Sequence, residues 1–224
     1  MVIHALLAAT LALTATPAAA APKIDCARLK CLALTFDDGP SEHTATLLKV
    51  LRKEGAKATF FLVGKQVERR PALARQEAAE GHAIGDHTYS HPSLPTLRDD
   101  DIIEELRTTQ ALIEDATGRR PKMYRPPYGH TDERVLRMAD QQDLAEILWT
   151  GTTLDWKLRD AKKIKATVLK LAKRDGVILM HDTVPQTVKA MPEILKELKK
   201  QGYTLVTVPT LLRGKVPESG VSYF

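Results

Sequence analysis

Short apolar runs alternate along this chain with longer segments of helical periodicity, and this alternation constrains the fold more than any other feature. One helical segment is clear at residues 100–118, where Ile102, Leu106 and Ile113 recur at the spacing of a helix face. Strands separated by helices pair in parallel through right-handed crossovers. The chain is therefore predicted to adopt an α/β fold, either a barrel or a doubly wound sheet. The predicted strands are 31–36, 58–63, 82–85, 122–125, 145–149, 177–180 and 203–208.

The length of the chain indicates one domain, and its charge pattern indicates the nature of the surface. The chain has 224 residues, of which 43% are hydrophobic, and this is enough for a single sizeable core. The net charge is +5 at pH 7, but Lys and Arg residues are interspersed with acids on the predicted helix faces and form no block. We interpret this pattern as a solvated basic surface, and we expect a monomer that binds no nucleic acid.

The first 21 residues have the pattern of an export signal. An apolar stretch at 5–20 is too short to span a bilayer and ends in the A-x-A pattern of Ala18–Ala20. The preceding residues, MVIH, include no Lys or Arg, which departs from the usual positively charged start. We predict cleavage just after Ala20 or Ala21. The product would be secreted, extracellular or associated with the cell wall, and would have no membrane attachment; a buried N-terminal helix is the alternative.

Export would place the two cysteines of the chain in an oxidising compartment. Cys26 and Cys31 are its only cysteines, and Cys31 begins the first predicted strand. We predict a short-loop disulfide that fastens the mature N-terminus to this strand, with a reduced pair as the alternative.

Clusters of polar side chains follow the predicted strands, each at the C-terminal end of its strand. In a β/α barrel these ends share one face, where active sites are built. Chance placement would put some of the clusters before strands. The clusters therefore predict one active site, made from Asp37 and Asp38, His87 and His91, Arg125 to Tyr128, Asp155 and Trp156, and His181, while Asp182 is expected to support its loop.

The two histidines of the second cluster suggest a metal site. His87 and His91 are four residues apart, so one helical turn would bring both imidazoles to the same side, close enough to bind one ion. No Glu follows His87, so the H-E-x-x-H motif of zinc proteases is absent. One aspartate from the first strand would complete a His-His-Asp set with open positions for water, the pattern of a catalytic metal site. Two unrelated surface histidines are the alternative.

Two adjacent carboxylates repel each other, so the pair Asp37 and Asp38 needs a compensating charge. A dication bound by one of them would hold it ionised and leave its neighbour free to act as a base. A glycosidase is excluded, because its two carboxylates flank the scissile bond roughly 5 to 9.5 Å apart, which adjacent residues seldom achieve. A simple turn at the D-G-P sequence is the remaining alternative, and it leaves Asp37 unexplained.

Five short motifs together resemble the polysaccharide deacetylases of the NodB-homology group, also called carbohydrate esterase family 4. The resemblance implies a single-domain distorted (β/α) barrel of about seven parallel strands, and a metal-dependent enzyme that removes acetyl groups from a polysaccharide. It places the domain at 31–212, after a mature N-terminal segment at 22–30 and before a C-terminal tail at 213–224. The motifs, in the family order, are TFDDGP at 35–40, HTYSH at 87–91, RPPYG at 125–129, LDW at 154–156 and LMHD at 179–182.

The resemblance also implies a role for individual motif residues. Asp37 would be the catalytic base, oriented by Arg125. His181 would be the acid that protonates the leaving group, tuned by Asp155. The main-chain N–H of Tyr128 would face the oxyanion. The implied metal ligands are Asp38, His87 and His91, and the implied substrate-binding residues are Pro126, Tyr128, Trp156 and Leu179.

Metal and substrate follow from the same resemblance in broader terms. Zinc is the first choice, with cobalt or another divalent ion as alternatives, because several ions accept two histidines and one carboxylate. The substrate would be a polymer of N-acetylglucosamine, such as peptidoglycan or chitin oligomers, or O-acetylated xylan. The chain departs from the family pattern at Thr152, which replaces an Asp, and at Asp86, which replaces an Asn, but neither change removes a named catalytic group. A noncatalytic glycan-binding module is the alternative, and the presence of both a base and an acid disfavours it.

Overall fold

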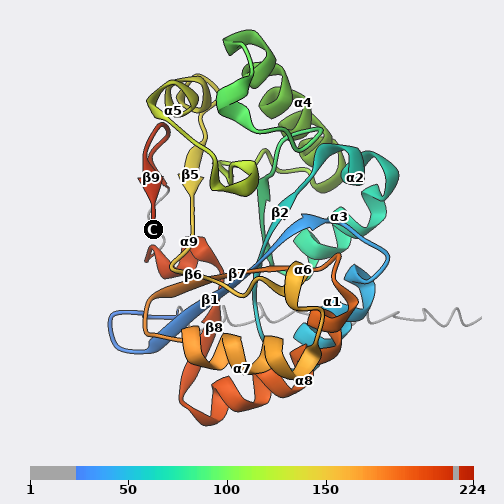
Figure 1. The fold of residues 1–224 in the computed structure, drawn as a ribbon, viewed down its shortest axis with the longest axis vertical. Helices are drawn as coiled ribbons and strands as arrows, with labels where there is room; N and C mark the ends of the chain where they lie inside the picture. Colours follow the sequence, from blue (N-terminus) through green and yellow to red (C-terminus); the bar gives the residue numbers. More distant parts are fainter. Residues whose placement is uncertain (1–23, 214–216) are drawn as a thin grey trace, which may run out of the picture.

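The computed structural model describes residues 24–213 and 217–224 (Figure 1). The predicted export signal at 1–21 lies outside the described residues and stays a prediction. Within the described part, no helix is both long enough and apolar enough to cross a membrane.

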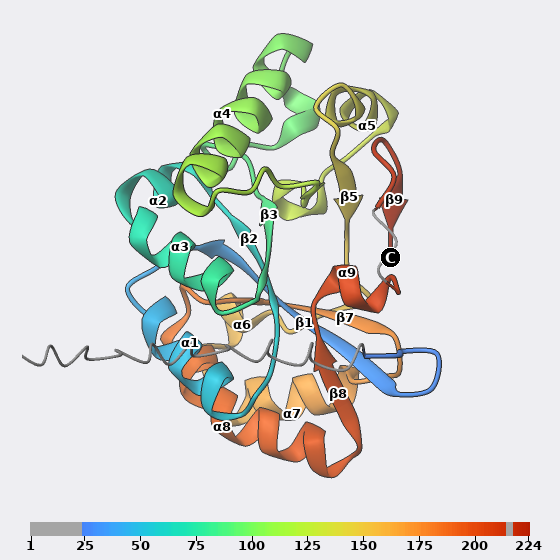
Figure 2. The same cartoon turned by 180° about the vertical axis from the view of Figure 1, so that it is seen from behind.

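Parallel strands form one curled sheet, an incomplete barrel that confirms the predicted α/β class and barrel (Figure 1, Figure 2). In the described residues the sheet has nine strands in the order β6-β7-β1-β2-β3-β4-β5-β9, with β8 beside β1. All the predicted strands are present, and β6 and β9, of two residues each, are additional. The strands are β1 (Lys30–Gly39), β2 (Thr59–Leu62), β3 (Ala83–Asp86), β4 (Met123–Tyr124), β5 (Ala145–Ile147), β6 (Gly151–Thr152), β7 (Gly176–His181), β8 (Tyr203–Val206) and β9 (Ser222–Tyr223).

Helices connect the strands, and most of them pack on the outside of the sheet. Helix α4 covers the predicted helical segment, begins with three Asp residues that suit the positive end of the helix dipole, and ends at Gly118 with φ of 72°. The helices are α1 (Thr44–Lys53), α2 (Gly64–Arg69), α3 (Pro71–Ala79), α4 (Asp99–Thr117), α5 (Glu133–Asp140), α6 (Asp155–Leu158), α7 (Ala161–Leu171), α8 (Pro185–Lys200) and α9 (Val208–Leu211), with 3₁₀ turns η1 (Leu94–Thr96) and η2 (Pro127–Gly129).

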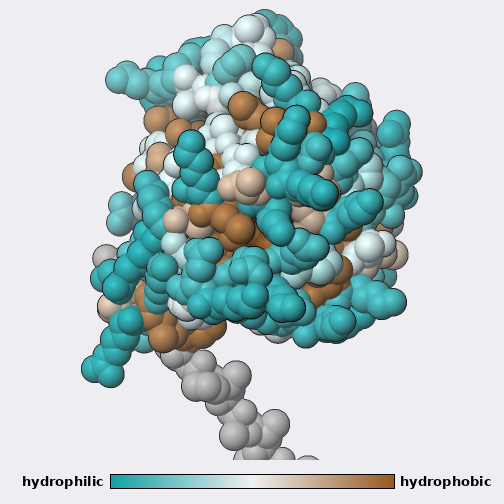
Figure 3. All heavy atoms as spheres, turned by 60° about the horizontal axis from the view of Figure 1, so that its bottom comes forward, coloured by the Kyte–Doolittle hydropathy of each residue, from teal (hydrophilic) through white to brown (hydrophobic). Residues whose placement is uncertain are grey.

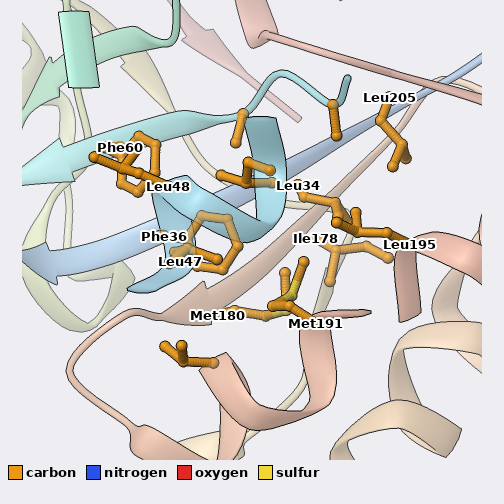
Figure 4. Packing of buried hydrophobic residues seen from close by; sticks show 14 of the residues in the cluster. Leu34, Phe36, Leu47, Leu48, Phe60, Ile178, Met180, Met191, Leu195 and Leu205 are labelled. Carbon is orange, nitrogen blue, oxygen red and sulfur yellow. The ribbon is translucent and has the colours of Figure 1, made fainter. Parts of the chain in front are cut away.

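Strand β1 pairs with β2, β7 and β8, and its side chains alternate between two cores. Leu32, Leu34 and Phe36 point outward and pack with residues of α1, α7 and α8. Cys31 and Ala33 belong to a second core inside the curled sheet. The same alternation directs alternate side chains near the C-terminal end of β1 to the inner face. Figure 4 shows the outer core and labels Leu34, Phe36, Leu47, Leu48, Phe60, Ile178, Met180, Met191, Leu195 and Leu205.

Both ends of the described chain are attached to the sheet. The predicted disulfide is present and joins Cys26 to Cys31, the second residue of β1. At the other end, the segment predicted as a tail adds β9 beside β5, where Ser222 pairs with Glu146. The predicted limits of the domain stay a prediction.

The surface over α7 and α8 carries interspersed charges. This lower side of Figure 1 comes forward in Figure 3, where most of the surface is hydrophilic. Lysines there pair with acids, as between Lys165 and Glu193 at 2.5 Å and between Lys199 and Glu54 at 2.7 Å. The mixture agrees with the predicted solvated basic surface.

Candidate active site

A cavity of about 410 Å³ opens at the C-terminal ends of the strands. At its rim, Tyr128, Leu154 and Trp156 are 63%, 44% and 52% exposed, which is unusual for such large apolar side chains. Arg125 and Asp155 are completely buried behind the wall. The structure thus brings the predicted site residues together. The lining residues are Asp37, Asp38, His87, His91, Pro126, Tyr128, Trp149, Thr152, Leu154, Trp156, Leu179 and His181.

Asp37 and Asp38 both line this cavity, although adjacent residues of a regular strand point to opposite faces. The end of β1 is irregular, because its pairing with β2 shifts register between Asp37 and Gly39 and because Asp38 has φ of 71°. An irregularity of this kind redirects a side chain. The two carboxylates can therefore share one cavity while contacting different partners.

Asp38, His87 and His91 each offer one ligand atom, and these atoms lie within 4.8 Å of one another. Oδ1 of Asp38 lies 3.4 Å from Nε2 of His87 and 3.2 Å from Nε2 of His91, and it is a buried oxygen without a hydrogen-bond partner in the described structure. Burial raises the pKa of Asp38, but the two imidazoles outweigh burial and hold the pKa well below its usual range. An ionised oxygen and two imidazole nitrogens in this arrangement fit a divalent cation.

The predicted helical turn between the two histidines is wrong. Residues 87–91 form an irregular loop after β3, in which Thr88 and His91 both have φ of 64°. The N–H of Thr88 donates to the carboxylate of Asp86 at 2.7 Å, and the N–H of His91 donates to the hydroxyl of Thr88 at 3.1 Å. The second of these bonds occupies the N–H of His91, which a helical turn would direct to the carbonyl of His87.

Further contacts fix the loop and aim the imidazoles. The carboxylate of Glu105 in α4 accepts hydrogen bonds from the N–H and the hydroxyl of Ser90, at 2.7 and 2.6 Å. Nδ1 of His87 lies 2.7 Å from the main-chain carbonyl of Arg125, which leaves Nε2 as the ligand atom. The ring centroids of His87 and His91 are consequently 4.9 Å apart.

Asp37 is held by Arg125, whose side chain is completely buried. Nη1 of Arg125 donates to Oδ1 of Asp37 at 2.8 Å and to the hydroxyl of Thr35 at 2.7 Å. Nε and Nη2 donate to the main-chain carbonyls of Ile147 and Leu148, at 2.9 and 2.7 Å. Since each guanidinium nitrogen has a partner, the group cannot turn away from Asp37, and the carboxylate keeps one orientation.

His181 is paired with Asp155 at the end of β7. Nδ1 of His181 lies 2.7 Å from Oδ1 of Asp155, and its main-chain N–H donates to Oδ2 at 2.8 Å. The hydroxyl of Thr187 donates to the same Oδ2 at 2.6 Å. Burial lowers the pKa of His181, but the hydrogen bond and charge of Asp155 outweigh it and raise the pKa to about 9. The raised pKa favours the protonated imidazole at neutral pH, and Nε2 lies 3.9 Å from Oδ2 of Asp38.

Three residues that hold the site together escaped the sequence analysis: Thr35, Glu105 and Thr187. Thr35 could have been found, because it stands two residues before Asp37 and so lies on the same face of the strand. Glu105 and Thr187 lie on α4 and α8, far along the chain from the groups that they bind. No spacing in the sequence connects them with the site.

The cavity joins a carboxylate fixed by a buried arginine, a histidine of raised pKa and three side chains that could hold a metal ion. This is the composition of a hydrolase site. The comparison with known families makes this class specific. The chain belongs to the polysaccharide deacetylase family, whose profile matches residues 25–147, and this confirms the resemblance to carbohydrate esterase family 4.

Individual known proteins show the same relation. A peptidoglycan-N-acetylglucosamine deacetylase of Bacillus cereus is 38% identical over 187 residues, which cover 81% of this chain and 68% of that protein. The peptidoglycan-N-acetylglucosamine deacetylase PgdA of Listeria monocytogenes is 38% identical over 196 residues, which cover 87% of this chain but 41% of PgdA. A solved structure described as "T48 deacetylase with substrate" has a TM-score of 0.86 at 40% identity, covering 90% of this chain and 100% of that one.

Proposed function

We propose that this protein is a secreted, metal-dependent deacetylase that hydrolyses N-acetyl groups of a cell-wall polysaccharide. The observation that carries the proposal is the single cavity that joins Asp37, His181 and the group Asp38, His87 and His91. The relatives from Bacillus cereus and Listeria monocytogenes are named for action on peptidoglycan, which favours this substrate over chitin oligomers or O-acetylated xylan. Secretion rests on the predicted export signal.

Asp38, His87 and His91 would hold the metal, with zinc as the first choice and cobalt or another divalent ion as alternatives. When bound, the metal supplies a water of lowered pKa and polarises the acetyl carbonyl. The lowered pKa of Asp38 keeps this ligand ionised at neutral pH.

Asp37 acts as the base and accepts the proton of the attacking water. Its Oδ1 is bonded to Arg125, so Oδ2 is the oxygen left to take up the proton. Because Arg125 is buried and held by several acceptors, the base has its position before substrate arrives. No reorganisation of this pair is then needed during the reaction.

His181 acts as the acid. An amide anion is a very poor leaving group, so the nitrogen must receive a proton as the C–N bond breaks. The proton comes from Nε2 of His181, while Nδ1 stays hydrogen-bonded to Asp155. Asp155 thereby keeps the ring charged before the transfer and oriented throughout.

The remaining lining residues would bind the substrate. The main-chain N–H of Tyr128 would stabilise the oxyanion that develops on the acetyl carbonyl. Pro126 and the buried Leu179 would pack against the acetyl methyl group. The exposed rings of Tyr128 and Trp156 offer apolar faces of the kind on which sugar rings pack.

Acetate release from peptidoglycan, chitin oligomers and O-acetylated xylan tests this function. We expect the highest kcat/KM on peptidoglycan, loss of activity after treatment with a chelator, and recovery when Zn²⁺ is added back. A protein that binds these glycans but releases acetate from none of them in the presence of metal would instead be the noncatalytic glycan-binding module.

Two aspartate variants separate the proposed ligand from the proposed base. Asp38→Ala removes a ligand, so bound metal and activity should fall together. Asp37→Asn should keep the metal and lower kcat by about 10²- to 10⁴-fold, because it removes only the base. Metal content per chain and kcat are measured on the same preparations, with circular dichroism to confirm folding. Stoichiometric metal in Asp38→Ala would refute the ligand assignment.

A further inference from the structure

The two proposed histidine ligands have different partners at their second ring nitrogen. Nδ1 of His87 faces the main-chain carbonyl of Arg125 at 2.7 Å, whereas Nδ1 of His91 lies 3.2 Å from the hydroxyl of Tyr128. Nε2 of each ring points to Asp38. A histidine that binds a metal through Nε2 carries its hydrogen on Nδ1, so Nδ1 is the donor in both contacts.

We propose that Tyr128 is a positioning residue for the metal, because its side-chain hydroxyl accepts the Nδ1 hydrogen of His91 and so fixes the tautomer and direction of this ligand. The inference rests on the proposed function, in which His91 binds the metal. It adds a second role to a residue whose main-chain N–H is assigned to the oxyanion.

The ring of Tyr128 is held in place on two sides. Its centroid lies 4.7 Å from that of His91 in an edge-to-face arrangement at 74°, and 5.4 Å from that of His130 at 41°. Nδ1 of His130 in turn lies 3.0 Å from the hydroxyl of Ser93, two residues after His91. The loop at 126–130 and the loop at 87–93 are thus connected at two points, and the hydroxyl of Tyr128 is held at His91.

The contact at Nδ1 of His87 and the contact at Nδ1 of His91 differ in the kind of partner and in exposure to solvent. The partner of His87 is a main-chain carbonyl, and His87 is only 2% exposed. The partner of His91 is a phenol oxygen on a side chain that is 63% exposed. Outer partners of metal ligands typically affect metal affinity by about 10- to 100-fold. Because water can replace an acceptor at an exposed position, we expect the lower end of this range for Tyr128.

Tyr128→Phe tests the inference, since it removes only the hydroxyl and keeps the ring, its packing and the main-chain N–H. The dissociation constant for Zn²⁺ is measured without substrate, by competition with a chromophoric chelator. We expect it to rise about 10-fold, while kcat at saturating Zn²⁺ changes less than the dissociation constant. Tyr203→Phe is the matched control, because Tyr203 is a buried tyrosine whose ring contacts Lys30, and its loss of a hydroxyl should leave Zn²⁺ affinity unchanged.

Each remaining outcome counts against a specific statement. If the wild type binds Zn²⁺ and Tyr128→Phe binds it equally well, the inference is overturned and the proposed function stands. If Tyr203→Phe weakens Zn²⁺ binding as much as Tyr128→Phe does, the effect is general and the inference is again overturned. If the wild type binds neither Zn²⁺ nor Co²⁺ nor another divalent ion, both the inference and the metal dependence of the proposed function fail.

Discussion

Asp155 and Glu77 are both acids whose side chains are completely buried, yet their surroundings differ in every other respect. Asp155, in the wall of the active site, accepts hydrogen bonds from His181 and Thr187. Glu77, in α3, has no hydrogen-bond partner for either oxygen among the described residues. Burial raises the pKa of both, but in Asp155 the hydrogen bond with His181 reverses the direction and the pKa falls below its usual value. In Glu77 burial acts with the charge of Asp182, and the pKa lies well above its usual value.

Partners, and not depth alone, therefore decide which buried groups stay charged. Two adjacent residues at the end of β7 show the same contrast. The raised pKa of His181, beside Asp155, favours its charged form. Burial raises the pKa of Asp182 to about 7 and outweighs the hydrogen bond from Thr44, which favours its neutral form. In the candidate active site, Asp37 and Asp155 each have a hydrogen-bond donor that compensates the buried charge.

The largest effect on stability is expected when Asp37, like Glu77, has no partner for its buried carboxyl group. Arg125→Met removes the guanidinium but keeps a long side chain, and it leaves Asp37, which is 2% exposed, without its cation. Removal of one partner of a buried ion pair typically costs about 3–5 kcal/mol. We expect the free energy of unfolding, measured by urea denaturation at neutral pH, to fall by about this amount.

Arg125→Lys is the matched variant, because it keeps a positive charge but loses the planar set of donors. It should be destabilised less than Arg125→Met. Equal losses in the two variants would mean that the packing of the side chain, and not its charge beside Asp37, stabilises the fold.

The second prediction concerns Glu77→Gln, which should become more stable relative to the wild type as pH rises, whereas Arg125→Met is destabilised. Because the pKa of Glu77 is raised in the folded protein, the stability of the wild type falls as pH rises above 4.5, the usual pKa of glutamate, until Glu77 ionises in the folded protein. In Glu77→Gln the side chain at this position does not titrate. The stability of this variant relative to the wild type should therefore increase with pH, by up to about 1.4 kcal/mol per pH unit.

Urea denaturation at about pH 5 and about pH 8 measures this trend. The control is Glu42→Gln, at a side chain that is 76% exposed, for which no comparable trend is expected. A constant difference between Glu77→Gln and the wild type at both pH values would show that Glu77 is not held neutral by folding.

The sequence was sufficient for most of the fold because strands such as 31–36, 58–63 and 203–208 are mostly apolar runs between helical segments. Strands β6 and β9 were not predicted, because Gly151–Thr152 and Ser222–Tyr223 form no apolar run. They exist only through pairing with β7 and β5, at positions such as Thr152 beside Leu179 and Tyr223 beside Ile147.

The candidate site could be predicted as a set but not in its local geometry. Its residues follow the strand ends, and this placement alone predicts that they meet. The spacing of His87 and His91 is compatible with a helical turn. The observed loop conformation is instead stabilised by hydrogen bonds to the side chains of Asp86, Thr88 and Glu105. Glu105 comes from a different helix, and such tertiary contacts leave no local signal in the sequence.

The smallest effect is expected from Asp155→Asn, which removes the charge of the buried acid that is paired with His181. In the wild type the pKa of His181 is raised from 6.5 to about 9, so the stability from this pair is fully present below about pH 6.5 and is lost as pH rises through about 9. In Asp155→Asn burial is opposed only by the smaller effects of Asp37 and Asp38, so the pKa of His181 should fall. Since the acid must be protonated, the alkaline limb of kcat/KM should move to lower pH, with the least change in rate on the acidic side of the profile. Thr187→Val is the matched control, because it removes one hydrogen bond to Asp155 and keeps the charge, and its alkaline limb should stay close to that of the wild type. An alkaline limb at the same pH in Asp155→Asn and the wild type would show that a group other than His181 controls it.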